Sequence, residues 1–144
     1  MKKFPTILLD SSVLAKWIFL DENNGIADDI KTKYSLGQLS IAVPVLLFYE
    51  INNLLESAVR SRRIEHDDAL QALDDFLALN LTAYSSESLL KRALRIALSF
   101  DISSYDASYL ALAEELKIPF ITADQKLINK VESKFLVSLK DFAL

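Results

Sequence analysis

Short apolar runs alternate with longer amphipathic stretches along almost the whole chain. Several runs are too uniformly apolar for strands with one solvated face, which is typical of strands buried in a parallel sheet. The runs lie at Thr6–Leu9, Ser40–Val43, Leu81–Tyr84, Phe120–Thr122 and Phe135–Ser138. Helical periodicity predicts helices at Val13–Phe19, Gly25–Leu36, Val45–Arg63, Asp67–Leu79, Ser86–Phe100, Ser104–Leu116 and Gln125–Lys134. This alternation predicts an α/β fold, a three-layer α/β/α sandwich around a mostly parallel sheet of about five strands.

The chain shows no linker and no internal repeat. It contains two glycines and three prolines, and no polar low-complexity segment separates the predicted elements. With 51% hydrophobic residues in 144, it can bury one sizeable core, so we expect a single domain over residues 1–144. The basic start reaches Asp10 after a few apolar residues, too few for a signal peptide or a membrane span. We therefore expect a cytoplasmic protein with no membrane association.

Composition limits the chemistry that is available. The chain has no cysteine and a single histidine, His66, so a bound metal would be held by oxygen atoms, which favours Mg²⁺ or Mn²⁺. The net charge of −4 argues against a protein that coats nucleic acid by bulk electrostatics. Clustered acids neutralised by divalent cations would weaken that objection. The basic residues Arg60, Arg62 and Arg63 either end a solvated helix or contact RNA, and both interpretations stay open.

Three acidic residues stand where strands end or helices begin. Asp10 directly follows the first apolar run, and Asp124 closely follows the fourth. In open parallel sheets the ligand crevice lies at the carboxyl ends of the strands, so we expect both acids at that edge. Asp106 follows Ser103 at capping-box spacing near the start of a late helix. Taken singly, each acid is also explained as a helix cap.

Glu50 differs because it lies inside a predicted helix, where capping does not explain it. It shares a stripe with Leu46, Leu47 and Leu54, and a core-facing carboxylate is costly unless it is paired or binds a cation. No basic residue lies three or four positions away. Asn53, one turn further on, is a candidate polar companion. The alternative is a carboxylate that reaches solvent past the helix edge.

The four acids together are more specific than any one of them. Asp10, Glu50, Asp106 and Asp124 would repel one another, which raises their pKa values unless divalent cations lie among them. Cations held by carboxylates can activate water and stabilise the oxygens of a phosphodiester displacement without any histidine or cysteine. The pattern therefore predicts a metal-dependent nuclease.

The chain resembles the PIN-domain family of nucleases, which includes the ribonuclease toxins (VapC type) of prokaryotic toxin–antitoxin pairs. Ile7–Leu14, with Asp10, is similar to the opening strand of the family, and Pro44–Leu55, with Glu50, to its second acidic segment. Ser104–Ala113 and Pro119–Asp124 are similar to its C-terminal block. The likeness covers almost the whole chain.

The resemblance implies an endoribonuclease in which Asp10, Glu50, Asp106 and Asp124 ligate one or two Mg²⁺ or Mn²⁺ ions. Ser12 falls on the family's hydroxyl position, and Thr122 is a further supporting candidate. Some relatives carry another acid shortly after the fourth, where this chain has Gln125, Lys126 and Leu127, so a firmly held second metal is not predicted.

The resemblance also implies an RNA substrate and a protein inhibitor (antitoxin). We expect the inhibitor to insert an Arg or Lys side chain among the carboxylates. We expect a homodimer as well, partly from the resemblance and partly because a helix apolar around most of its circumference, such as Val45–Val59, leaves apolar surface to cover.

Other acid-bearing folds fail at particular residues. A receiver domain needs an acidic pair at the first strand and an Asp ending a middle strand, but Asp10 stands alone and Leu81–Tyr84 has no acid. An adhesion module of the D-x-S-x-S type would need serine at Leu14, and a D-x-D phosphatase would need Asp at Ser12. The remaining alternative is a non-catalytic PIN-like module that binds partners or serves as a scaffold.

Overall fold

A computed structural model describes residues 4–143, and at its centre is a five-stranded sheet in the order β3-β2-β1-β4-β5. Every pair of neighbouring strands is parallel. The strands are β1 Thr6–Leu9, β2 Ser40–Pro44, β3 Thr82–Tyr84, β4 Phe120–Thr122 and β5 Leu136–Ser138. β1 lies in the middle, and its residues Ile7 to Leu9 are buried on both faces of the sheet, which explains why they are all apolar rather than alternating with polar residues.

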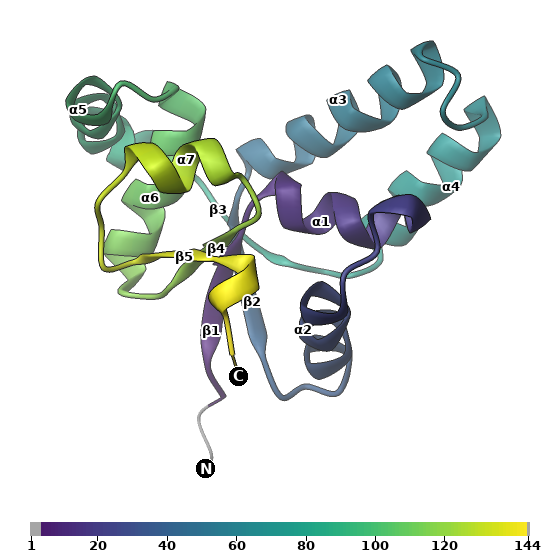
Figure 1. The fold of residues 1–144 in the computed structure, drawn as a ribbon, viewed down its shortest axis with the longest axis horizontal. Helices are drawn as coiled ribbons and strands as arrows, with labels where there is room; N and C mark the ends of the chain where they lie inside the picture. Colours follow the sequence, from purple (N-terminus) through teal and green to yellow (C-terminus); the bar gives the residue numbers. More distant parts are fainter. Residues whose placement is uncertain (1–3, 144) are drawn as a thin grey trace.

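Helices cover both faces of the sheet, so the predicted α/β/α sandwich is confirmed (Figure 1). The helices α1 and α2 lie on one face, and α5, α6 and α7 on the other. The helices are α1 Ser11–Ile18, α2 Gly25–Ser35, α3 Leu46–Arg60, α4 His66–Leu77, α5 Leu90–Phe100, α6 Ser104–Leu116 and α7 Gln125–Lys130. Short 3-10 turns lie at η1 Leu20–Glu22, η2 Glu87–Leu89 and η3 Leu139–Asp141.

The pair α3 and α4 forms a helical arm that extends beyond the sheet (Figure 1). The arm packs through a buried stripe of α3, consisting of Leu47, Ile51, Leu55 and Ala58. In the loop that joins α3 to α4, Arg63 donates to Asp21 and Glu22, each at 2.8 Å, and its guanidinium carbon lies 4.0 Å from the centre of the Phe19 ring. The arm is thereby tied to the loop that follows α1.

Three predicted helix boundaries were wrong by three or more residues. The helix predicted at 45–63 ends at Arg60, and Ser61 is its C-cap. The predicted helix at 125–134 ends at Lys130, because Val131 is already extended and the chain must turn to enter β5 in parallel with β4. The predicted helix at 86–100 begins with the 3-10 turn η2, and α5 itself starts at Leu90. None of the helices described here is long and apolar enough to cross a membrane.

The order of elements decides which residues meet at the carboxyl edge of the sheet. In a parallel sheet a helix that follows a strand starts at this edge, and a helix that precedes a strand runs back from it. Thus α1 after β1, α3 after β2 and α7 after β4 begin here, and so does α6 before β4. All four predicted acids stand at or near these helix starts.

Candidate active site

Asp10 is the most enclosed of the four acids, with 7% of its surface exposed. It directly follows β1 and caps α1, because its Oδ1 accepts a hydrogen bond of 3.1 Å from the backbone N–H of Ser12. The capping interpretation is therefore correct for Asp10. The cap hydrogen bond uses only the Oδ1 atom of the carboxylate, so capping does not exclude a second role for Asp10.

Two hydroxyl groups hold the Asp10 carboxylate. Ser12 Oγ donates to Oδ1 and Thr122 Oγ1 donates to Oδ2, both at 2.5 Å. Each hydroxyl donates its one proton in the hydrogen bond to Asp10. Its oxygen can therefore only accept further hydrogen bonds, and it accepts one from a backbone N–H just after β4. Ser12 Oγ accepts from the N–H of Ala123 at 2.9 Å, and Thr122 Oγ1 from that of Asp124 at 3.1 Å. The start of α1 is thus joined to the end of β4.

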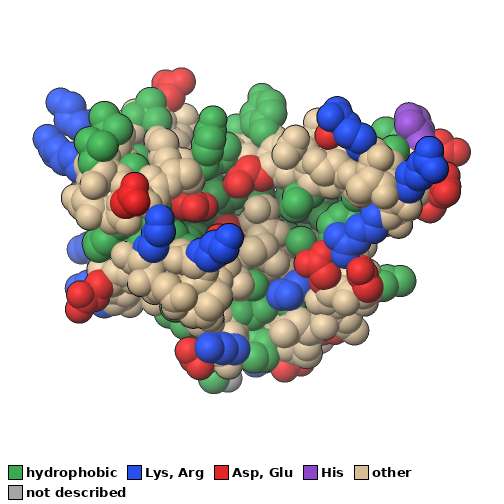
Figure 2. Space-filling model, turned by 45° about the horizontal axis from the view of Figure 1, so that its top comes forward, with side chains coloured by type: hydrophobic (Ala, Val, Ile, Leu, Met, Phe, Trp, Pro, Cys, Tyr) green, Lys and Arg blue, Asp and Glu red, His purple; other side chains and the backbone are tan. Residues whose placement is uncertain are grey.

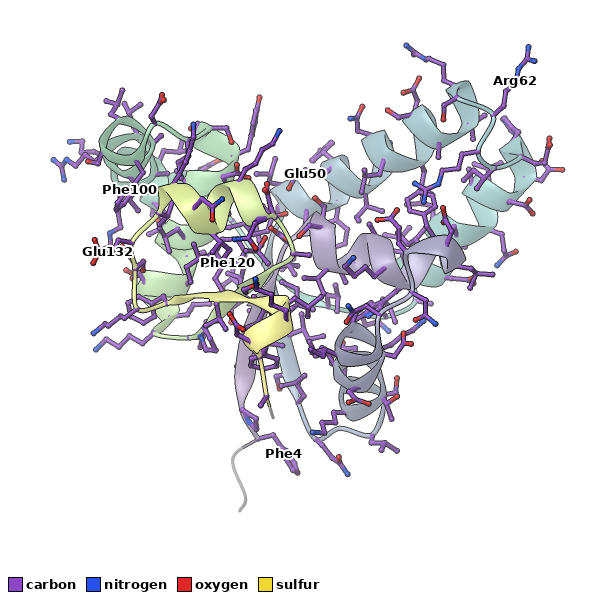
Figure 3. The ribbon with its side chains drawn as sticks, viewed as in Figure 1. Phe4, Glu50, Arg62, Phe100, Phe120 and Glu132 are labelled. Atoms are coloured by element: carbon purple, nitrogen blue, oxygen red, sulfur yellow. The ribbon has the colours of Figure 1, made fainter. Side chains whose placement is uncertain are left out.

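Glu50 lies in the second turn of α3 and is half-buried. Figure 3 places it near the base of the arm, on the side that faces α6 and α7. Its Oε1 accepts a hydrogen bond of 2.5 Å from the hydroxyl of Tyr109 on α6. A recess of roughly 460 Å³ lies beside Glu50 and is also lined by Tyr49, Asn53 and Tyr105.

Asp106 and Asp124 occupy the first turns of α6 and α7. Ser103 caps α6 by accepting from the N–H of Asp106 at 3.0 Å, as the capping-box spacing predicted. Asp124 caps α7, since its Oδ1 accepts from the N–H groups of Lys126 and Leu127 at 2.9 and 3.2 Å. Both carboxylates are half-buried. Figure 2 shows acidic side chains near the middle of this face, with basic side chains beside them.

The surroundings of Asp10 favour its protonated form. Burial is the largest cause and raises the pKa of Asp10 to about 6, because the charged carboxylate loses its hydration. Hydrogen bonds from Ser12, Thr122 and the N–H of Val13 lower the pKa, and the negative charge of Glu50 raises it. Burial therefore outweighs three favourable hydrogen bonds.

Glu50 and Asp106 are affected in the same direction. Burial raises the pKa of Glu50, the Tyr109 hydroxyl lowers it, and the charge of Asp106 raises it again. Burial also raises the pKa of Asp106, the Ser103 hydroxyl partly offsets this, and the charge of Asp124 adds to it. The charge of Glu50 thus raises the pKa of Asp10, that of Asp106 raises the pKa of Glu50, and that of Asp124 raises the pKa of Asp106.

Comparison with known proteins agrees with this geometry. The family model described as PIN domain matches residues 7–133. The chain belongs to the PIN domain family. It is 29% identical to ribonuclease VapC3 of Pyrobaculum aerophilum over 129 residues, which are 86% of this chain and 93% of that protein.

Solved structures share the PIN fold with this chain. The crystal structure of PAE2754 from Pyrobaculum aerophilum superposes with a TM-score of 0.73 at 23% identity, covering 94% of this chain and 85% of that one. A toxin–antitoxin complex from Klebsiella pneumoniae contains a chain with a TM-score of 0.63 at 16% identity, covering 92% of this chain and 97% of that one. At these identities the likeness concerns the fold.

In this PIN domain the four acids share one edge without forming a closed cage. Among residues 4–143, no group of three or more Asp, Glu and His side chains is arranged to hold a metal ion. The hydrogen bonds described above occupy both oxygens of Asp10 and one oxygen each of Glu50 and Asp124. We call the four acids, together with the recess that Glu50 alone among them lines, the acidic recess.

The predicted supporting residues differ in how closely they contact the acids. Ser12 and Thr122 bond directly to Asp10, whereas Asn53 is exposed and lines the recess beside Glu50. Arg63 is occupied by Asp21 and Glu22, and Arg62 lies at the far tip of the arm (Figure 3). For these two arginines the structure favours the interpretation as a solvated helix end.

Sequence reasoning missed Tyr109. In the sequence it reads as one aromatic residue among the apolar positions of the predicted helix at 104–116. A signal was nevertheless present, because Tyr109 follows Asp106 by three positions and residues at that spacing share one helix face. The spacing alone therefore places the Tyr109 hydroxyl on the same face of the helix as Asp106.

Proposed function

We propose that this PIN domain is a divalent-metal-dependent endoribonuclease and the toxin of a toxin–antitoxin pair. The observation that carries the proposal is the placement of Asp10, Glu50, Asp106 and Asp124 at one edge of the sheet, where burial and, to a smaller extent, the charge of a neighbouring acid raise the pKa values of the first three. Isolated helix caps would not need to face one another. The relationship to ribonuclease VapC3 supports the same activity.

The donor set fits Mg²⁺ or Mn²⁺. It consists of carboxylates, which are ligands that these hard cations prefer, and a cation would remove the mutual repulsion that adds to the effect of burial on their pKa values. An open recess also suits Mg²⁺, which usually keeps several water ligands instead of occupying an all-protein cage. We therefore assign Asp10, Glu50, Asp106 and Asp124 as the residues that would hold the metal.

A bound divalent ion would supply an activated water and stabilise negative charge on the phosphodiester oxygens. The chain's own residues prepare the recess for this reaction. Ser12 and Thr122 fix both oxygens of Asp10, and the half-buried recess excludes part of the solvent around Glu50. The N-termini of α1 and α6 also lie at this edge, and their partial positive charge favours an anionic substrate.

We also propose an antitoxin partner, which occupies the acidic recess and places an Arg or Lys side chain among the carboxylates. Such a side chain would compete with the metal for the same negative field. The structural likeness to a chain of a toxin–antitoxin complex supports this partner.

The proposed homodimer has a different apolar face from the one that we expected. The apolar positions of α3 are largely buried against α4, α1 and β2, so they leave less surface to cover than the sequence suggested. Three exposed leucines lie on α5, where Leu90, Leu94 and Leu98 form a stripe with exposures of 55%, 55% and 76%. A second copy of the chain would cover this stripe.

The test of the activity is cleavage of a panel of structured and single-stranded RNAs by the purified protein. We expect cleavage with added Mn²⁺ and none with excess chelator. The variants Asp10→Asn and Asp106→Asn remove ligand charge at nearly constant volume, so we expect both to fold and to lose cleavage. Asp101→Asn is the matched control, because Asp101 is a fully exposed acid at the C-cap of α5 that does not line the recess.

The outcomes separate the two functions that the sequence leaves open. Cleavage that survives Asp106→Asn would remove that residue from the metal centre. A wild-type protein that neither binds Mn²⁺ nor cleaves any RNA would favour the non-catalytic binding or scaffold module.

A further inference from the structure

Tyr109 carries a polar atom into the most buried part of the molecule. Its side chain is among the largest that are fully enclosed, with 1% exposed. A buried hydroxyl needs a partner, because an unsatisfied one costs about 1–3 kcal/mol. The partner is the Glu50 carboxylate, to which the hydroxyl donates at 2.5 Å.

The position of this hydroxyl is fixed by the core. The Tyr109 ring stacks on the ring of Phe120 with a centroid distance of 5.5 Å and an interplanar angle of 19°. Phe120 belongs to β4 and is itself 1% exposed, near the centre of the molecule (Figure 3). Helix α6 and the sheet therefore hold the donor in place, whereas Glu50 comes from the arm.

Glu50 has no other anchor among the described residues. The bond from Tyr109 is the only hydrogen bond that residues 4–143 give to its carboxylate, and no Lys or Arg forms an ion pair with it there. Asp10, by contrast, is held at both oxygens. A long Glu side chain held at one point loses that point completely when the donor is removed.

We propose that Tyr109 is a positioning residue, whose hydroxyl holds the Glu50 carboxylate by Oε1 and so keeps Oε2 available to the metal. This inference rests on the proposed function, since it presumes that Glu50 is a ligand. Hydrogen-bond donors that orient metal ligands commonly change metal affinity or activity by about 10- to 100-fold when they are removed. A hydroxyl that merely satisfies the core would change stability alone.

The test is Tyr109→Phe, which removes the hydroxyl and keeps the ring that stacks on Phe120. We expect calorimetric titration with Mn²⁺ to show a metal affinity about 10- to 100-fold weaker than in the wild type. The matched control is Tyr34→Phe, which also removes a tyrosine hydroxyl that is bonded, at 2.6 Å to the carbonyl of Leu79, but away from the acids. Both variants should lose some thermal stability, and only Tyr109→Phe should lose metal affinity.

A double-mutant cycle shows whether Tyr109 acts through Glu50. If it does, Tyr109→Phe will weaken Mn²⁺ binding in the wild-type background and have no further effect in a Glu50→Gln background. In cleavage assays Tyr109→Phe should lower kcat with little change in KM for RNA, because the hydroxyl is buried and does not meet the substrate.

Two results would overturn the inference while leaving the proposed function intact. One is a Tyr109→Phe protein that binds Mn²⁺ as tightly as the wild type, and the other is an equal loss in the Tyr34→Phe control. Failure of the proposed function itself looks different, because the wild-type protein would then bind no Mn²⁺.

Discussion

Thr122 and Asp10 are 112 positions apart in the chain, yet the Thr122 hydroxyl donates a hydrogen bond of 2.5 Å to Oδ2 of Asp10. The bond runs between the ends of two neighbouring strands, β4 and β1, which pair in parallel. It therefore depends on the register of these strands. Asp10 is buried, so the bond is also one of the few ways in which its charge is compensated.

The first prediction concerns this hydroxyl. Thr122→Val keeps the shape of the side chain and removes the donor, so Oδ2 of Asp10 loses its partner. We expect a loss of about 1–3 kcal/mol in the free energy of unfolding, measured by chemical denaturation. Thr82→Val, on the exposed β3, is the control. Equal stability of wild type and Thr122→Val would show that the hydroxyl does not support Asp10.

The second prediction is a pH dependence of stability in the presence of chelator. With the pKa of Asp10 raised from 3.8 to about 6, the folded state holds its proton over a range in which the unfolded state has released it. Stability should therefore fall as the pH rises from 4 to 6, by up to about 3 kcal/mol from this residue, and level off above that range. Glu50 and Asp106 contribute in the same direction because their pKa values are also raised.

Asp10→Asn isolates the share of Asp10. The variant has no carboxylate to titrate, so its stability should fall less between pH 4 and pH 6 than that of the wild type. Parallel curves for the two proteins in urea denaturation would show that the pKa of Asp10 is not raised in the folded state.

The third prediction separates position from composition on α3. Glu50→Gln should weaken Mn²⁺ binding in calorimetric titration, because it removes charge from the acidic recess. Glu56→Gln, on the same helix, should not, because Glu56 pairs with Arg60 at the surface. Identical affinities for both variants would mean that Glu50 only completes the edge of the core.

The fourth prediction tests the homodimer through the leucine stripe on α5. Leu94→Asp places a charge in the middle of this stripe, so sedimentation at micromolar concentration should show a monomer where the wild type is a dimer. Leu70→Asp on α4 is the matched control, since Leu70 and Leu94 have similar exposures of 53% and 55%. A monomeric wild type would remove the dimer, and dissociation by Leu70→Asp alone would move the interface to the arm.

The amino-acid sequence was sufficient to predict the class of fold and the edge of the sheet at which the acids lie. Uniformly apolar runs such as Ile7–Leu9 need burial on both faces, which a parallel sheet between helices provides. Once strands and helices alternate in one compact chain, strand direction places Asp10 and Asp124 at the carboxyl edge. Local rules also gave the capping roles of Asp10, Asp124 and Ser103, because capping involves residues only two or three positions apart.

The tertiary structure decided the order of the strands and the partner of each carboxylate. A hydrogen bond requires its donor within about 3 Å, and such distances between remote segments follow from packing rather than spacing. Thr122 reaches Asp10 because β4 lies beside β1. Tyr109 reaches Glu50 because its ring stacks on the ring of Phe120 in β4. The sequence therefore located the acids, and only the packing of α6, β4 and α3 decided what holds them.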